Sequence, residues 1–162
     1  MKPTIYLAGA IRDNQAEDIH WREEIISALR GQVTILSPLA GKEYDSVTGL
    51  WTMSGRPTTA RGIVSQDCWA VDRADIVVFN FLPLAEGYAS IGTLTEWGRS
   101  TARSVLRYVI AARNFKGHDN TRTFKTLHPF IAEFATEIFE TTNECRDYLA
   151  RHIQCLNGEN PR

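Results

Sequence analysis

The chain has 162 residues, of which 43% are hydrophobic and 23% charged, and its formal net charge is -1. This length and composition are typical of one globular domain with a substantial core, so we expect a single domain over residues 1–162. The near-neutral charge and the lack of a basic block argue against binding to a nucleic-acid polymer. A small anionic ligand needs only one or two local donors and stays possible. No apolar run is long enough to span a membrane.

The cysteines are odd in number and widely spaced at Cys68, Cys145 and Cys155, which does not suggest a disulfide framework and favours a reducing cytoplasm. The first ten residues turn polar too soon to form a secretion signal, so they predict a strand. Cys145, Cys155 and His152 lack CxxC spacing and a fourth ligand. We therefore predict no metal site and assign them to a terminal helix.

The first third of the chain begins as a strand, a helix and a second strand. Residues 4–10 form a short apolar run that ends in glycine, residues 15–30 show a helical pattern, and residues 33–36 are apolar again. The apolar stripe of the helix consists of Ile19, Ile25, Ile26 and Leu29.

Residues 40–59 contain several glycines and a proline and show no clear period, so they predict a long irregular loop. Loops of this length are often functional lids or disordered segments. Trp51 and Met53 in this segment have two interpretations, because they would either cover a ligand or pack on a neighbouring subunit.

The rest of the chain repeats the alternation of helix and strand. Helices are predicted over 61–73, 91–103, 128–134 and 143–156, and strands over 75–81, 104–112 and 135–139. The predicted buried side of the 61–73 helix consists of Ile63 or Val64, Cys68 and Val71. This order indicates a layered α/β fold with right-handed crossovers.

The stretch SIGTLTEWG, residues 90–98, follows the third predicted strand and its loop. In parallel sheets, ligands bind beyond the carboxyl ends of the strands. Gly92 and Glu96 are four residues apart and share a helical face. A small molecule lying over Gly92 would bring its reactive carbon against the Glu96 carboxylate. The alternative is an ordinary surface glutamate.

Two other groups of residues have both a functional and a structural interpretation. Backbone N–H groups of Gly9, Ala10 and Ile11, with the Arg12 guanidinium and the Ser90 hydroxyl, form either an anion site or a tight turn and a plain helix cap. Tyr6, in the first strand, either bonds a carboxylate or fills the core.

Asp67 and Asp72 are five residues apart on one predicted helix and face different ways, so at most one of them points into the site. A second carboxylate beside Glu96 would suit chemistry in which one acid attacks and the other handles a proton.

Several segments, in this order and spacing, resemble the nucleoside 2-deoxyribosyltransferase family. They are IYLAGAIRD, the Trp21-Arg22 pair, LSPLAGKEY, QDCWAVDRADIVVFNF, SIGTLTEWG and HPF at 128–130. The resemblance implies a flavodoxin-like, three-layer α/β sandwich with a five-stranded parallel sheet. It also implies cleavage of the N-glycosidic bond of 2'-deoxynucleosides in nucleotide metabolism, with no metal or organic cofactor.

The resemblance also implies roles for single residues. The nucleophile falls on Glu96, the tyrosine that orients it on Tyr6, and the aspartate that assists protonation of the leaving base on Asp67. Lys42 takes the base-side position, where the transferases commonly have glutamine. A homodimer or higher homo-oligomer with shared sites is implied, with His128 as the residue reaching a neighbouring subunit.

Ser90 stands where transferases of free nucleosides usually have an aspartate that binds the sugar 5'-hydroxyl. A serine there, with Gly9-Ala10-Ile11-Arg12, is similar to the related 2'-deoxynucleoside 5'-monophosphate N-glycosidases. We expect a deoxyribosyl–Glu96 ester, resolved by water or a second base with overall retention. The alternative function is a non-catalytic nucleotide-binding or sensing module on the same fold.

Overall fold

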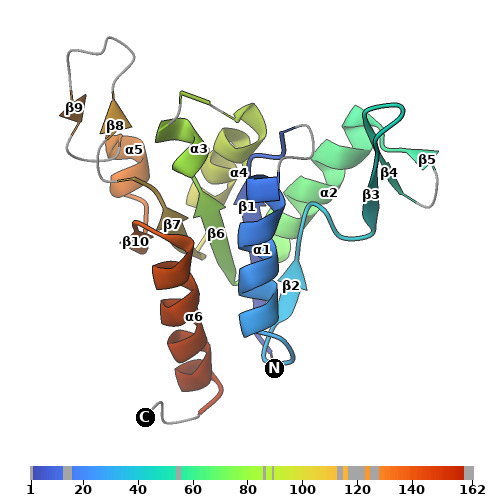
Figure 1. The fold of residues 1–162 in the computed structure, drawn as a ribbon. Coiled ribbons are helices and arrows are strands. Elements are labelled where there is room, and N and C mark those ends of the chain that lie inside the picture. The colour runs from blue at the N-terminus through green and yellow to red at the C-terminus, as the bar shows by residue number, and fades with distance from the viewer. Residues whose placement is uncertain are drawn as a thin grey trace.

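The computed structural model describes residues 2–12, 16–53, 56–85, 87–88, 90–112, 115–116, 123–124 and 128–158. Its centre is a five-stranded parallel sheet in the order β10-β7-β6-β1-β2. The strands are β1 (Thr4–Gly9), β2 (Thr34–Leu36), β6 (Ile76–Asn80), β7 (Leu106–Ile110) and β10 (Glu137–Phe139). All five correspond to the predicted strands, and the α/β prediction is confirmed (Figure 1).

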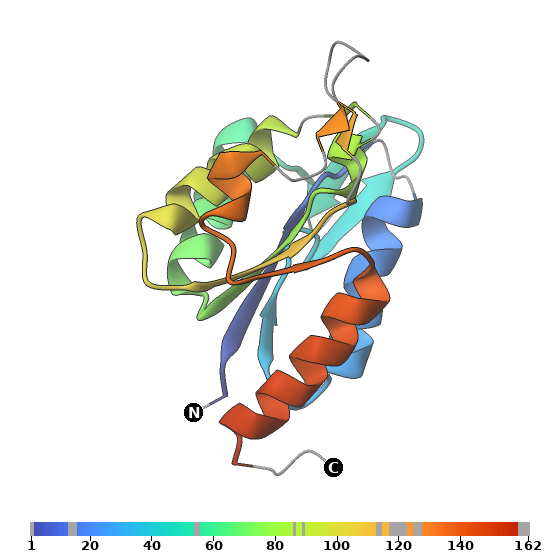
Figure 2. The same ribbon diagram turned by 90° about the vertical axis from the view of Figure 1, so that its left-hand side faces the viewer.

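Helices cover both faces of the sheet, as Figure 2 shows. One layer contains α1 (Ala16–Ala28) and α6 (Thr142–Leu156), and the other contains α2 (Ala60–Arg73), α4 (Ile91–Thr101) and the short α5 (Pro129–Ala132). None of the helices in the described part of the chain has the length and apolarity needed to cross a bilayer.

The alternation of side chains along β1 builds two separate cores. Tyr6 and Ala8 pack toward α2 and α4, whereas Ile5 and Leu7 pack toward α1 and α6. All of β6 is buried, as expected for a central parallel strand. Tyr6 therefore carries a polar group into the α2–α4 layer from the middle of the sheet.

The carboxyl ends of β1 and β6 lie side by side, because Gly9 pairs in register with Asn80. The connection after β1 runs through α1 on one face of the sheet, whereas the chain after β6 runs through α4 on the other. This reversal is the topological switch point, where α/β sheets of this type bind ligands.

The prediction of an irregular loop over 40–59 is wrong. Antiparallel strands β3 (Lys42–Asp45), β4 (Leu50–Met53) and β5 (Arg56–Pro57) form a separate three-stranded sheet. Local chemistry holds the first hairpin: the Asp45 carboxylate accepts from the N–H of Val47 at 2.9 Å. Gly49 supplies a left-handed backbone with φ 69°. Trp51 packs edge-on against Tyr44 across the strands, with 5.3 Å between ring centroids.

Other local predictions also need correction. The helix α3 (Leu82–Ala85) and the strand pair β8 (Phe115–Lys116) and β9 (Thr123–Phe124) were not predicted. On α2, Val64 is 60% exposed and Ile63 is half-buried, so Ile63 takes the inward position.

The predicted apolar stripe of α1 is only partly right. Ile25 and Leu29 are buried, but Ile19 and Ile26 are only half-buried. The other buried residues of the helix are Asp18, Trp21 and Arg22. Hydrophobicity alone cannot find this face, because two of its members are charged and are satisfied by partners that the sequence does not show.

Candidate active site

Tyr6 and Glu96 meet between β1 and α4. The Tyr6 hydroxyl donates to Glu96 Oε1 at 2.6 Å, across 90 residues of sequence. Ser90 caps α4, where its Oγ accepts from the Thr93 backbone N–H at 3.3 Å and from Thr93 Oγ1 at 3.0 Å. The cap fixes where α4 begins, so it fixes the turn from which Glu96 points at β1.

The Glu96 carboxyl has a pKa of about 7, well above its ordinary value. Burial is the main cause, and the negative charge of Asp67 adds to it, whereas the Tyr6 hydrogen bond and the Arg22 charge oppose it. Burial and the Glu96 charge raise the pKa of Tyr6, so its hydroxyl stays protonated and remains a donor.

Asp67 reaches the same cluster from α2. Its Oδ1 is buried and accepts no hydrogen bond from any described residue. Burial raises the pKa of this carboxyl, while the Lys42 charge lowers it. Asp72 instead forms an ion pair with Arg99 on the outer side of the helix, with Nε 2.8 Å from Oδ1. The prediction that at most one of the two acids points inward is confirmed.

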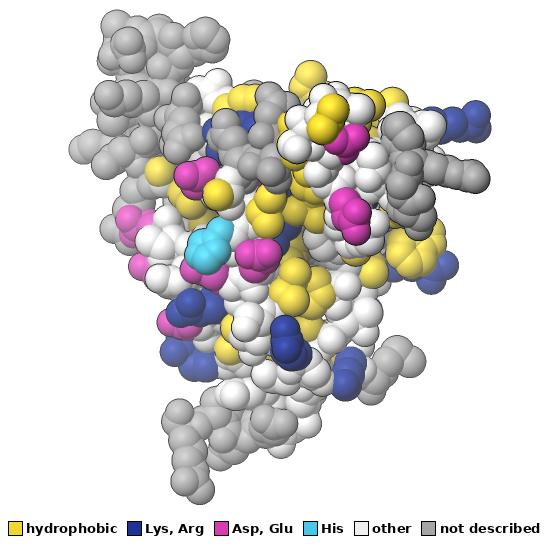
Figure 3. Space-filling model, turned by 45° about the vertical axis from the view of Figure 1, so that its right-hand side comes forward, with side chains coloured by type: hydrophobic (Ala, Val, Ile, Leu, Met, Phe, Trp, Pro, Cys, Tyr) yellow, Lys and Arg dark blue, Asp and Glu magenta, His cyan; other side chains and the backbone are white. Residues whose placement is uncertain are grey.

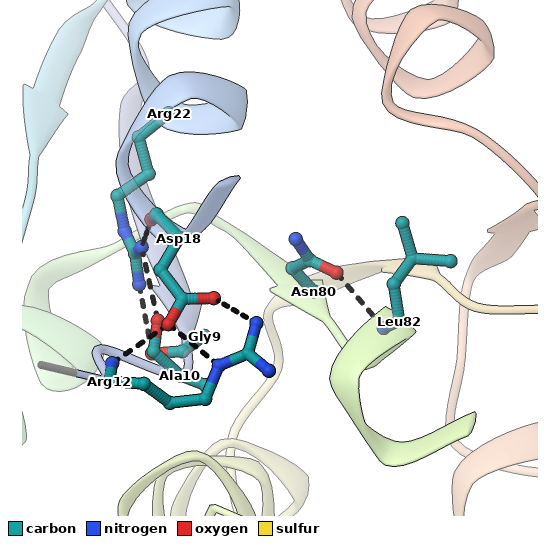
Figure 4. A network of polar contacts seen from close by, with 7 residues as sticks. All are labelled: Gly9, Ala10, Arg12, Asp18, Arg22, Asn80 and Leu82. Atoms are coloured by element: carbon teal, nitrogen blue, oxygen red, sulfur yellow. Dashed lines mark hydrogen bonds and ion pairs between the residues drawn. The ribbon is translucent and has the colours of Figure 1, made fainter. Parts of the chain in front are cut away.

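The turn after β1 is fixed by α1 (Figure 4). Asp18, itself buried, accepts from the Arg12 backbone N–H at 2.7 Å and from the Arg12 guanidinium at 2.9 Å through both Nε and Nη2. Arg12 also lies over the Tyr88 ring, 5.4 Å from its centroid. Two-point pairing of this kind holds the guanidinium in one position at the end of the strand.

Arg22 is a member of this network to which the sequence assigned no function. Its guanidinium is fully buried and donates to the carbonyls of Gly9 at 2.8 Å, Leu7 at 3.3 Å, and Ala10 and Asp18. The only sequence signal was the Trp21-Arg22 pair, and Arg22 stacks on Trp21 with 4.6 Å to the ring centroid.

The same packing explains why residue 9 is glycine. A Cβ there would lie 3.0 Å from Trp21 Cζ2 and 3.3 Å from Asn80 Cβ. The glycine lets α1 approach the strand end, whether or not its N–H also binds a ligand.

A pocket opens at the switch point beside this turn. Its lining includes Ala10, Asn80, Tyr88, Ser90 and Thr93. Gly92 is exposed, and a Cβ added there would meet only Ser90 Oγ at 3.8 Å. Ile11 is half-buried within the turn.

His128 does not join these residues. It caps α5, is exposed, and stacks on Phe130 with 5.7 Å between ring centroids. Trp97 Nε1 donates to the Phe130 carbonyl at 3.2 Å, which ties α5 to α4. His128 therefore lies on the exposed side of the α4–α5 pair, and any site to which it contributes would lie on that side.

The surface and the titratable groups show two further points. On the face drawn in Figure 3, acidic, basic and apolar side chains are interspersed, and the described residues form no continuous basic surface there. In the part of the chain that the structure describes, no three His, Cys, Asp or Glu side chains are grouped to hold a metal ion.

The fold has known counterparts among solved structures. A conserved protein from Enterococcus faecalis superposes with a TM-score of 0.64 at 12% identity, covering 94% of this chain and 99% of that one. A 2-deoxyribosyltransferase from Leishmania mexicana gives 0.64 at 17%, covering 93% and 98%. The Clostridium botulinum CMP N-glycosidase BcmB gives 0.55 at 12%, covering 90% and 97%. No curated protein sequence matches the chain.

The sequence match is more specific than these superpositions, which at such identities show the fold alone. The family model described as "Nucleoside 2-deoxyribosyltransferase like" matches residues 2–115. That range includes β1, α2, β6 and α4, and so all of Tyr6, Asp67 and Glu96. The chain belongs to the nucleoside 2-deoxyribosyltransferase-like family.

Proposed function

We propose that the protein cleaves the N-glycosidic bond of 2'-deoxynucleosides or their 5'-monophosphates and passes the deoxyribosyl group to another base or to water. The observation that carries this proposal is the partly buried hydrogen bond from Tyr6 to Glu96, with Asp67 near enough to raise the pKa of Glu96. Glycosyl transfer through a carboxylate needs one carboxyl that attacks and a second that moves a proton, and in this member of the family burial perturbs the pKa of both Glu96 and Asp67.

In the first step, Glu96 attacks C1' of the sugar. Tyr6 holds Oε1, so Oε2 is the oxygen placed to form the new bond. The C1'–N bond breaks as the C1'–O bond forms, and its electron pair leaves with the base. We assign to Asp67 the proton that this base takes up, because it is the second carboxyl beside Glu96. The transition state has oxocarbenium character.

In the second step, water or a nucleobase nitrogen attacks C1' from the face that the first base left. The C1'–O bond to Glu96 breaks and its electron pair returns to the carboxylate. Asp67, now ionised, accepts the proton that the attacking group loses. Two inversions give overall retention.

The remaining predicted residues are assigned to the two ends of the substrate. We assign Lys42 to the base side, because its charge acts on Asp67. Ser90 already accepts two hydrogen bonds from Thr93, so its own hydrogen is left to donate. Together with Arg12 and the N–H groups of the β1 turn, Ser90 favours a phosphate at the sugar 5' end.

We also propose that the protein forms a homo-oligomer. Ile91 on α4 is 82% exposed and Phe130 on α5 is 71% exposed, and the Trp97 hydrogen bond joins these two helices. A second copy of the chain covering them would bring a His128 region to the neighbouring site. The three cysteines are free thiols, which fits a reducing cytoplasm.

The test is incubation with each 2'-deoxynucleoside and each 5'-monophosphate, with and without a free acceptor base. Chromatography should show released base or exchanged nucleoside. Rapid-quench mass spectrometry should show a transient gain of one deoxyribosyl or phosphodeoxyribosyl group. Glu96→Ala should lose activity on the order of 10⁴-fold, whereas Thr95→Ala, an exposed neighbour on the same helix, should not.

Two outcomes would contradict the proposal. Binding of nucleotides without turnover by the wild type would favour the non-catalytic binding module. Full activity of Glu96→Ala would remove Glu96 as the nucleophile.

A further inference from the structure

Asn80 ends β6 at the switch point, opposite Gly9 in the sheet register. Its Oδ1 accepts from the Leu82 backbone N–H at 3.0 Å, at the start of α3. Because an N–H requires an acceptor, this contact decides which side of the amide is oxygen and which is nitrogen. Figure 4 shows the Asn80 nitrogen directed away from Leu82.

The NH₂ group of Asn80 has no acceptor among the residues that the structure describes, although the residue is only 8% exposed. Among the described residues the Asn80 amide nitrogen is not one of the buried side-chain atoms that lack a partner, so it is accessible to solvent and can donate to a ligand. Neither the packing nor the cap on α3 needs these N–H groups, because the cap uses only Oδ1.

The position of Asn80 indicates what the NH₂ group would meet. Asn80 lines the pocket that also holds Ser90 and Thr93. It also borders a groove of about 300 Å³ lined in part by Arg12 and Asp18. Asn80 therefore lines one hollow with Ser90 and a second with Arg12, the two residues already assigned to the sugar 5' end.

We propose that Asn80 binds the 5'-phosphate of the substrate by donating its amide N–H to a phosphoryl oxygen, and so favours monophosphates over free nucleosides. This inference rests on the proposed function and adds a specificity residue to it. Phosphoryl oxygens only accept hydrogen bonds, so a third donor beside Ser90 and Arg12 raises the affinity for a phosphate more than for a hydroxyl.

A purely structural role for Asn80 and a phosphate-binding role predict different rankings of the damage caused by N80D and N80A. N80D keeps the acceptor for Leu82 and the side-chain shape, but it replaces the donor with a negatively charged oxygen. N80A removes both the acceptor and the donor. If Asn80 only caps α3, N80A is the more damaging change. If Asn80 binds phosphate, N80D is the more damaging change for monophosphates, because it adds repulsion to the lost bond.

The experiment measures binding by calorimetry in the Glu96→Gln background, which prevents turnover. The ligands are a 2'-deoxynucleoside 5'-monophosphate and the nucleoside with the same base, and thermal unfolding checks that each variant is folded. We expect N80D to weaken monophosphate binding about 100-fold and N80A about 10-fold. Nucleoside binding should change less than about threefold in either variant.

Equal losses for both ligands, or a larger monophosphate loss in N80A than in N80D, would overturn the role of Asn80. Failure of the parent protein to bind any monophosphate would overturn it too, while turnover of free nucleosides by the wild type would leave the proposed function standing. If the wild type shows no turnover but N80D weakens monophosphate binding more than N80A does, the proposed reaction is overturned and the phosphate contact of Asn80 stands.

Discussion

Two clusters of ionisable side chains lie on opposite faces of β1, and they differ in how well they are satisfied. On the α1 face, Arg22 is fully buried but donates to four backbone carbonyls and stacks on Trp21. On the α4 face, Glu96 has one hydrogen bond from Tyr6, and Asp67 Oδ1 has none among the described residues. Both clusters bury charge, but only the first provides a partner for each polar group.

This difference separates a structural cluster from a reactive one. Buried polar groups are normally paired, and those that are not mark strain or function. The Arg22 network fixes the turn that carries Arg12, whereas the Glu96 cluster holds two carboxyls away from their preferred ionised state. The comparison predicts that mutations on the two faces change stability in opposite directions.

The largest expected effect is on the α1 face. Arg22→Met should lower the free energy of unfolding by about 3–5 kcal/mol, because it leaves several buried carbonyls without donors. Urea unfolding would measure the loss, and Arg151→Met, an exposed position on α6, is the matched control. A loss below about 1 kcal/mol would mean that water or neighbouring groups donate to the buried carbonyls in place of Arg22. The proposed difference between a satisfied and an unsatisfied cluster would then be wrong.

On the α4 face, Glu96→Gln should stabilise the protein at alkaline pH. The folded pKa of Glu96 is about 7 against an ordinary value of 4.5, so the folded state holds the proton more tightly than the unfolded state. The contribution of Glu96 to stability is therefore greatest below about pH 4.5 and falls as the pH rises to about 7. Glutamine keeps an acceptor for Tyr6 without the charge, and at pH 8 it should add roughly 3 kcal/mol.

This gain should shrink as the pH is lowered and disappear near pH 4, where the wild-type carboxyl is neutral in both states. Unfolding curves at pH 4 and pH 8 measure it, and the exposed Glu133→Gln is the control. The same gain at both pH values would assign the effect to packing rather than to the buried charge.

The sequence predicts the two faces of β1 unequally well. The sheet could be predicted because each strand is a short apolar run between helical patterns. Tyr6, Asp67 and Glu96 could be found because their motif segments resemble those of the family. The Arg22 network could not, because its acceptors are backbone carbonyls, which every residue has and no sequence pattern marks.

Two other features also depend on contacts between distant or small elements. The β3–β4 hairpin depends on a Tyr44–Trp51 contact and a turn around Asp45, which are weak signals in a glycine-rich segment. Asn80 looks like any residue of a buried strand until the Leu82 N–H shows which way its amide points.

Smaller effects should appear in the titration of Glu96 itself. Tyr6→Phe removes a hydrogen bond that favours the ionised carboxylate, so the pKa of Glu96 should rise above about 7. A ¹³C NMR titration of the Glu96 carboxyl would show the higher pKa directly. If ionised Glu96 is the nucleophile, the rising limb of kcat/KM moves to higher pH by the same amount. Activity at acid pH then falls about tenfold for each pH unit that the limb moves.

Asp67→Asn should move the same titration in the opposite direction, by less, because only the repulsion from a neighbouring negative charge is removed. The pKa of Glu96 should then fall, although kcat falls at every pH if Asp67 is also the proton donor to the base. Measuring both quantities separates the two roles of Asp67. A lower pKa with unchanged kcat would leave Asp67 only an electrostatic role, and an unchanged pKa would show that Asp67 and Glu96 do not share one site.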